Sequence, residues 1–201
     1  MENLRSFTSN FAELPEKDFT DLESLFEPMK IKKMDHVLTM GTYVKDLYFF
    51  NKGTFRVYHL KEGEEFTTKF LFGPCIYAEL FSIRKLTPTF YNIQALTDCD
   101  CYKADFLQVE KLRDSSPNIG RLFLKLYEHI YMAGVKRQVS FILDSQTKRY
   151  NNLVNENPQI LEQIPLQYKA SFIGVKPETL SRIRKKNNDI LHVCFDLLNT
   201  R

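Results

Sequence analysis

The sequence predicts an α+β chain in three parts: a β-roll, a long helix and a small basic helical domain. Short segments rich in β-branched and aromatic residues, separated by glycines, fill most of positions 29–105. A long helical pattern follows them, and the residues after about 145 are polar and mostly helical. We therefore expect a β-roll domain at 1–114, a helix at 115–144 and a helical domain at 145–201.

Composition favours a packed globular protein. Of the 201 residues, 43% are hydrophobic and 17 are phenylalanine, so the chain can bury a sizeable core. No apolar run approaches the roughly 20 residues that a membrane span needs, and the N-terminus lacks the apolar core of a signal peptide. The expected location is cytoplasmic, without membrane partners.

Positive charge is concentrated in the last quarter of the chain. Residues 145–201 hold nine Lys and Arg against five Asp and Glu, whereas residues 1–144 hold 19 against 20. This asymmetry points to a polyanionic partner for the helical domain.

The expected elements follow from local pattern. Residues 14–26 read as a short helix with Pro15 in its first turn. The stretches 29–41, 46–60, 64–72 and 89–105 are short and partly alternating, which is typical of strands in a barrel-like roll. A short helix is expected at 104–112.

The long helix begins after the candidate caps Ser115 and Ser116, with Pro117 in its first turn. Apolar residues then recur at intervals of four and three, which is typical of a helix that pairs with its own copy. The predicted dimer interface is Ile119, Phe123, Leu126, Ile130 and Ala133. The alternative is that this face lies on the chain's own sheet.

Residues 165–186 have the spacing of a helix-turn-helix. Ala170 is small where two helices must approach closely, and Gly174 supplies the backbone freedom for the turn. The predicted inner face is formed by Ile173, Val175, Leu180 and Ile183. The second helix starts at Pro177 and would turn Glu178, Ser181, Arg182, Lys185 and Lys186 outward, where they can read base edges and hold phosphates. A solvated helix in an ordinary bundle is the alternative.

Two segments resemble the cyclic-AMP receptor protein/Fnr (Crp/Fnr) family of bacterial transcription regulators. "GVKPETLSRIRKK" (174–186) is similar to the recognition helix of that family, and residues 46–79 are similar to its β-roll. The resemblance implies an N-terminal double-stranded β-helix, a homodimer joined through the long helix, and two recognition helices in successive major grooves about 34 Å apart. It implies DNA contacts from Gln167, Lys176, Glu178, Thr179, Ser181, Arg182, Lys185 and Lys186, and RNA polymerase as a further partner.

The chain departs from the family pattern at three places. Lys176 stands where the family has a Ser or Thr cap, and Lys169 stands where it has an apolar residue, so the Lys169 stem would have to snorkel. The segment 187–201 is too short for a full β-hairpin wing.

The resemblance places the effector pocket at Ala78, Glu79, Leu80, Thr89 and Phe90. Thr89 and Phe90 occupy the positions of the Arg and Ser or Thr that bind the cyclic phosphate in the family. Without that positive charge a buried phosphate is not compensated, so cyclic AMP is not expected as effector. The pocket would take an unidentified, apolar or uncharged ligand, or be collapsed on Phe90 and Tyr91. Glu79 would then serve only at a helix start.

The other reactive residues give no sign of catalysis or of a cofactor. Cys99 and Cys101 lie at strand spacing and read as buried hydrophobes, and the four histidines are scattered without metal-ligand spacing. The favoured function is a sequence-specific DNA-binding transcription regulator. The alternatives are a small-molecule-binding module whose helical tail mediates protein contacts without DNA binding, and a metal-dependent β-roll enzyme. The sequence leaves the effector, the operator, the target genes and the direction of regulation open.

Overall fold

The structure, a computed structural model, describes residues 1–186. The N-terminal part runs α1 (Glu2–Ser9), α2 (Glu16–Glu23), β1 (Glu27–Ile31), β2 (His36–Leu38), β3 (Asp46–Lys52), β4 (Thr54–Lys61), β5 (Glu64–Phe72), β6 (Cys75–Ala78), α3 (Leu80–Lys85), β7 (Asn92–Ala95) and β8 (Cys99–Asp105). The rest is helical: α4 (Phe106–Ser115), α5 (Pro117–Leu143), α6 (Gln146–Glu156), α7 (Ile160–Gln163), α8 (Leu166–Ile173) and a helix at 177–186. The predicted α+β class is confirmed, with α1 as an element that the sequence pattern did not indicate.

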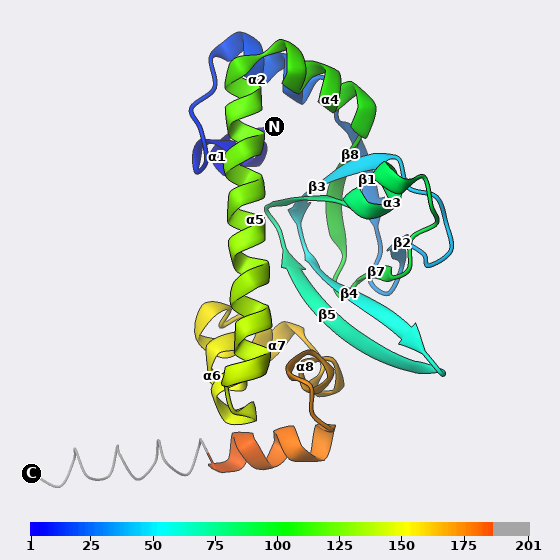
Figure 1. The fold of residues 1–201 in the computed structure, drawn as a ribbon, viewed down its shortest axis with the longest axis vertical. Helices are drawn as coiled ribbons and strands as arrows, with labels where there is room; N and C mark the ends of the chain where they lie inside the picture. Colours follow the sequence, from blue (N-terminus) through cyan, green and yellow to red (C-terminus); the bar gives the residue numbers. More distant parts are fainter. Residues whose placement is uncertain (187–201) are drawn as a thin grey trace, which may run out of the picture.

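Two four-stranded sheets form the roll. Their strand orders are β1-β8-β3-β6 and β2-β7-β4-β5, and every pairing is antiparallel. Gly53 joins β3 to β4 with φ +120°, and a Cβ on it would overlap the Cys99 sulfur, so only glycine fits this crossing. The long helix α5 runs beside the roll from one end of the molecule to the other (Figure 1).

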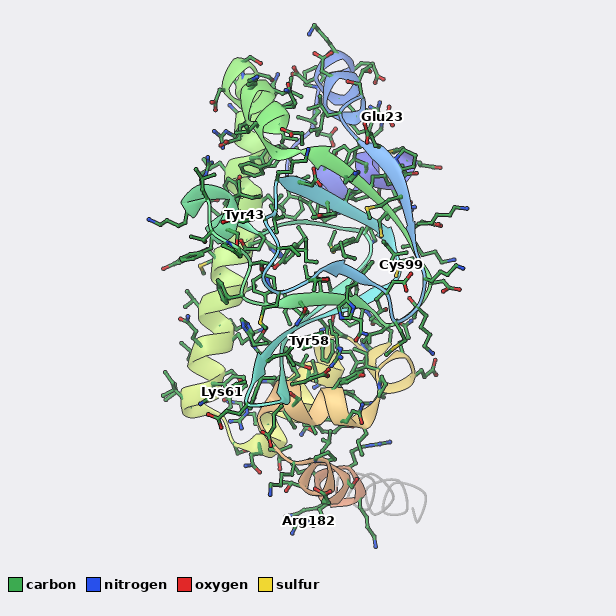
Figure 2. All side chains as sticks on the ribbon, turned by 90° about the vertical axis from the view of Figure 1, so that its right-hand side faces the viewer. Glu23, Tyr43, Tyr58, Lys61, Cys99 and Arg182 are labelled. Carbon is green, nitrogen blue, oxygen red and sulfur yellow. The ribbon has the colours of Figure 1, made fainter. Side chains whose placement is uncertain are left out.

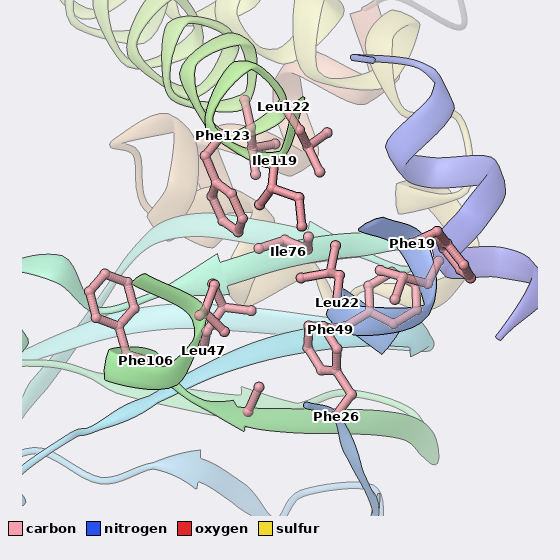
Figure 3. Close-up of a cluster of buried hydrophobic side chains, with 14 residues drawn as sticks. Phe19, Leu22, Phe26, Leu47, Phe49, Ile76, Phe106, Ile119, Leu122 and Phe123 are labelled. Carbon is pink, nitrogen blue, oxygen red and sulfur yellow. The ribbon is translucent and has the colours of Figure 1, made fainter. Parts of the chain in front are cut away.

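The first core lies between one sheet and the helices that cover it. Leu47, Phe49 and Ile76 of the sheet pack against Phe19 and Leu22 of α2, together with the first half of α5 (Figure 3). Ser116 begins α5, because its hydroxyl oxygen accepts a hydrogen bond from the Ile119 N–H at 3.3 Å. The cap thereby fixes α5 over this sheet.

The roll interior is filled by aromatic rings. Phe50 and Phe55 stack with centroids 4.1 Å apart, and Tyr48 and Tyr77 stack on Phe50 as well. The cluster also includes the buried residues Leu38, Val57, Leu71, Tyr91, Ile93, Ala95, Cys99 and Cys101. Side chains thus occupy the space between the two sheets.

The C-terminal helices share a third core with the roll. Tyr150, Leu153, Ile160, Ile164, Ala170, Ile173 and Leu180 form it together with Phe70 of β5 and Leu96. Figure 1 places α6, α7 and α8 beside the far end of α5, next to the β4–β5 hairpin. The helical part is therefore packed onto the roll.

Candidate functional site

Two helices joined by a short turn form the candidate nucleic-acid interface. α8 ends at Gly174, which has the left-handed conformation (φ 74°, ψ 43°) that closes helices at low cost in glycine. The Val175 N–H donates to the Ala170 carbonyl at 3.0 Å, and this turns the chain toward the next helix. An added Cβ at Gly174 would lie 3.1 Å from the Phe141 ring, so the close packing on α5 also favours glycine.

The predicted inner face of the pair is buried as expected. Ala170, Ile173 and Leu180 are at most 1% exposed, and Val175 and Ile183 are half-buried against the same core. Burial of this face on α6 and α7 fixes which side of the helix at 177–186 is directed outward.

The outward face carries the predicted DNA-contacting residues. Seven of the eight are exposed: Gln167 on α8, Lys176 in the turn, and Glu178, Ser181, Arg182, Lys185 and Lys186 on the second helix. Thr179 is half-buried, and its hydroxyl accepts a hydrogen bond from an Arg182 guanidinium nitrogen at 3.4 Å. Arg182 projects from the end of the molecule farthest from Glu23 (Figure 2). Charged groups that alternate with a short polar side chain on one helix face match the chemistry of base edges and phosphates.

Lys169 differs from its predicted behaviour. Its side chain does not snorkel to water but is 3% exposed, and its ammonium donates to the Ile160 and Leu161 carbonyls at 3.3 and 3.2 Å. Burial, with a further contribution from Arg184, lowers the pKa of Lys169 below its usual value. The lysine shares the Ile160 carbonyl with the Ile164 N–H and also binds the Leu161 carbonyl of the short helix α7, which sequence spacing could not reveal.

Two arginines that the sequence reading missed anchor the C-terminal end of α8. Arg137 of α5 donates to the Phe172 carbonyl at 3.0 Å, and Arg149 of α6 donates to the Ile173 carbonyl at 2.9 Å. Both guanidinium groups also lie over the Phe141 ring, at 4.8 and 4.9 Å. Burial, followed by repulsion from Arg149, lowers the pKa of Arg137 to about 10, which leaves it charged at neutral pH. Cations at a helix C-terminus stabilise it.

The predicted dimer interface is wrong for three of its five residues. Ile119, Phe123 and Leu126 are 0%, 2% and 4% exposed, because the first half of α5 packs on the chain's own sheet (Figure 3). The alternative reading of this face therefore applies to them. Ile130 and Ala133 lie beyond the sheet and are exposed, so their part in an interface stays a prediction.

The predicted effector cassette surrounds α3. Glu79 is the N-cap of α3, and its carboxylate, which is 3% exposed, accepts a hydrogen bond from the Ser82 N–H. Glu79 thus lies at the start of α3 and caps it. Ala78 ends β6, and Leu80 opens α3 with 36% exposure.

Arg84, a cation of the cassette, is engaged by a residue outside the cassette. Arg84 forms two hydrogen bonds with the Glu110 carboxylate of α4, one of 2.8 Å, and its guanidinium lies 5.2 Å from the centre of the Phe106 ring. The charge of Arg84 is therefore compensated outside the predicted pocket. Thr89 is buried, with its hydroxyl 3.5 Å from the Tyr91 carbonyl oxygen.

Aromatic side chains occupy the place of the predicted phosphate-binding pair. The Phe90 ring lies between 5.3 and 5.5 Å from the rings of His59, Phe81 and Tyr91. The Tyr91 hydroxyl is in turn hydrogen-bonded to that of Tyr77 at 2.5 Å, and burial raises the pKa of both phenols. Tyr91 is 8% exposed, whereas Phe90 and Phe81 are 49% and 55% exposed, so a collapse of the pocket on Phe90 and Tyr91 stays a prediction.

Burial keeps the thiols of the roll protonated. Cys99 and Cys101 are 4% and 1% exposed, and burial raises the pKa of Cys101 to about 12 and also that of Cys75 to about 12. A thiol held protonated is a poor nucleophile and a poor metal ligand. Among the described side chains, no group of three or more His, Cys, Asp and Glu lies close enough to hold a metal ion. Within residues 1–186, no helix is both long and apolar enough to cross a bilayer.

Comparison with known proteins agrees with this architecture. A sequence model of the family described as "Cyclic nucleotide-binding domain" matches residues 28–116. A search of curated proteins gave no match.

Three solved structures share the fold over most of both chains. FixK2 from Bradyrhizobium japonicum is 14% identical, with a TM-score of 0.69 over 82% of this chain and 85% of that chain. The c-di-GMP responsive global regulator CLP from Xanthomonas campestris is 12% identical, with a TM-score of 0.67 over 87% and 92%. A transcriptional regulator of the crp/fnr family from Eubacterium rectale is 16% identical, with a TM-score of 0.65 over 86% and 83%. Residues 28–116 are thus similar to the cyclic nucleotide-binding domain family, and the chain as a whole shares the fold of FixK2, CLP and the Eubacterium rectale regulator.

Proposed function

We propose that this chain is a homodimeric, sequence-specific DNA-binding transcription regulator. The observation that carries the proposal is the exposed face of the helix at 177–186, which presents Glu178, Arg182, Lys185 and Lys186 on a pair of helices whose other face is buried. Arg can bond guanine bidentately, Glu can accept from cytosine, and Lys can hold phosphates. The net positive charge of residues 145–201 adds attraction to a polyanion.

The dimer would form through the face of α5 opposite the roll. Leu124, Tyr131, Val135, Gln138 and Ile142 follow one another at intervals of seven, four, three and four residues, so they lie along one side of the helix. Leu124, Tyr131 and Ile142 are 59%, 70% and 79% exposed in the single chain. Nothing lies within 4 Å of a Cβ built on Gly134, so a second helix can approach closely there.

The effector domain would not respond to cyclic AMP. A cyclic phosphate needs a cation in the pocket, and Arg84 is paired with Glu110 while Phe90 makes edge-to-face contacts with Phe81 and Tyr91. Any effector would be an uncharged or apolar small molecule. We further propose a cytoplasmic protein that is not an enzyme and acts with RNA polymerase.

Selection of bound sequences from a random duplex pool tests this function. The expected result is a near-palindromic motif whose half-sites lie about one helical turn apart, because each protomer brings one recognition helix. A pool that shows no enrichment, while the protein binds a small molecule tightly, would favour instead a ligand-binding module with a protein-contacting tail.

A further inference from the structure

The outer face of the β4–β5 hairpin carries α8, the first helix of the candidate DNA-binding pair. The Thr67 N–H of β5 donates to the Ser171 hydroxyl at 2.8 Å, and that hydroxyl donates to the Glu65 carbonyl at 3.1 Å. Phe70 of β5 lies against Phe172 with ring centroids 5.0 Å apart. The hairpin is therefore a direct structural connection between the roll and the DNA-binding part.

Arg56 lies at the centre of this contact. Its side chain is 2% exposed, its Nη1 is 2.6 Å from a Glu65 carboxylate oxygen, and its Nε donates to Gln94 at 2.9 Å. The guanidinium carbon also lies 4.1 Å from the centre of the Tyr58 ring and 3.7 Å from that of Tyr168. Only Tyr168 among these partners comes from α8, whereas the others belong to the roll.

A buried guanidinium is costly unless its charge is compensated on every side. The Tyr168 ring compensates the side that the roll leaves open, through a cation–π contact that is strongest when water is excluded. If α8 moved away from the hairpin, Arg56 would lose this partner and Phe70 would lose part of its cover. The contact thus favours one placement of α8 against the roll.

Strand β4 links this contact to the effector cassette. Arg56 and Tyr58 lie on the face of β4 near α8, while Phe55 and Val57 lie on the opposite face in the roll interior. His59, which alternates with them toward that interior, contacts Phe90 and Tyr91 at 5.5 Å. A displacement of β4 at the cassette would therefore also displace Arg56.

While α8 is packed on the β4–β5 hairpin, the outward face of the helix at 177–186 remains exposed. Glu178, Arg182 and Lys186 remain exposed while α8 contacts the hairpin, and the helix at 177–186 lies at the end of the molecule (Figure 1). The contact does not block DNA; it fixes the direction in which the reading helix points. A protein that is already ordered in its binding conformation loses less entropy on binding.

We propose, on the basis of the DNA-binding function proposed above, that Arg56 and Tyr168 are positioning residues that hold the helix pair 166–186 against the β4–β5 hairpin in a DNA-competent orientation. They act through α8 and touch no DNA themselves. Loss of their contact increases the population of undocked protein, which reduces the apparent affinity for every duplex by the same factor.

Two variants of Tyr168 test the contact in the full-length protein. Tyr168→Leu keeps an apolar side chain but removes the ring face, and Tyr168→Phe keeps the ring and removes only the hydroxyl. Amide hydrogen exchange of α8 is expected to rise about fivefold in Tyr168→Leu, as about 1 kcal/mol of lost cation–π stabilisation requires. It stays at the wild-type rate in Tyr168→Phe, and the amides of β3 and β8 exchange equally in all three proteins. Equal exchange of α8 in the Leu and Phe variants would overturn the proposal.

Duplex binding supplies the second measurement. Tyr168→Leu should weaken binding to preferred and unrelated duplexes by the same factor, roughly two- to fivefold, with no change in the slope of log affinity against log salt, because no base or phosphate contact is lost. Faster exchange without any loss of affinity would show that the contact does not position the reading helix and would also overturn the proposal. Absence of duplex binding by the wild-type protein would contradict the proposed function instead, and the exchange result would still decide whether Arg56 and Tyr168 hold α8.

Discussion

Arginine and large apolar side chains have different surroundings in residues 75–126 and in residues 127–186. In the first region Arg84 is paired with Glu110, Phe90 makes an edge-to-face contact with Tyr91, and Leu126 is 4% exposed in the core. In the second region Ile142 is 79% exposed and Arg182 lies on an open helix face. Arg84 and Leu126 find their partners within the chain, whereas Ile142 and Arg182 are left exposed to other molecules, as is Leu124 near the end of the first region.

The difference shows where binding is to be expected. An exposed apolar stripe such as that on α5 marks a surface for protein contacts, and an exposed basic helix attracts a polyanion. In contrast, the cation Arg84 of the cassette is already paired with Glu110, and the Glu79 carboxylate is buried as the N-cap of α3. The side-chain contacts therefore distinguish the effector cassette from the exposed surfaces of α5 and of the helix at 177–186. We expect binding at those exposed surfaces.

The largest expected effect compares the two halves of α5. Leu126→Ala should lower the free energy of unfolding by about 2–5 kcal/mol, since it leaves a cavity in the core. Tyr131→Ala should instead act through assembly, so that its effect on urea unfolding grows as the protein is diluted. Light scattering should give a dimer for the wild type at micromolar concentration. If the Leu126→Ala effect depended on concentration and that of Tyr131→Ala did not, the interface would instead lie on the face that carries Ile119, Phe123 and Leu126.

The reading helix gives the next largest effect. Arg182→Ala should cost about 1–3 kcal/mol on the preferred duplex and relax the preference at one base pair in each half-site. Its matched control, Lys186→Ala, should weaken all duplexes about equally and reduce the salt slope, because a phosphate contact carries no base information. A loss of the same factor on preferred and random duplexes in Arg182→Ala would mean that this helix does not read sequence.

Lys169 offers a smaller effect with a defined pH dependence. Because burial lowers its pKa in the folded protein, the unfolded chain binds more protons between that lowered value and 10.5. Wild-type stability therefore rises with pH through this window, and at pH 7 the buried charge is unfavourable. Lys169→Met removes the titrating group together with the donor to the Ile160 and Leu161 carbonyls, so its stability should not show this rise and the gap between the two proteins should change with pH across the window. A gap that stayed constant across this range in chemical denaturation would contradict the assignment.

For cyclic AMP we expect no measurable binding. Calorimetric titration with cyclic AMP should give no binding at micromolar concentration, since the predicted pocket holds Thr89 and Phe90 in place of a cation and a small hydroxyl residue. A micromolar dissociation constant would show that the aromatic cluster opens and that another cation enters the site.

Sequence pattern predicted the order of the roll, the long helix and the C-terminal helices, because strand alternation, caps and turn glycines are local. The inner face of the helix pair followed from spacing alone, and Ala170, Ile173 and Leu180 are buried as that spacing required. The role of α5 did not follow, because an apolar stripe at intervals of three and four looks the same whether a sheet or a second helix covers it. Arg56 and Tyr168 are 112 positions apart, and no periodicity brings two such residues together.

Sequence preference in duplex binding tests the central claim most directly. The affinity of the full-length protein should be measured for the duplex selected from a random pool and for a scrambled duplex of equal length, over a range of salt concentrations. We expect that both affinities fall as salt rises and that the selected duplex binds at least about a thousandfold more tightly at physiological salt. Equal affinities for the two duplexes at every salt concentration would contradict it and would leave only general attraction between the basic C-terminal region and a polyanion.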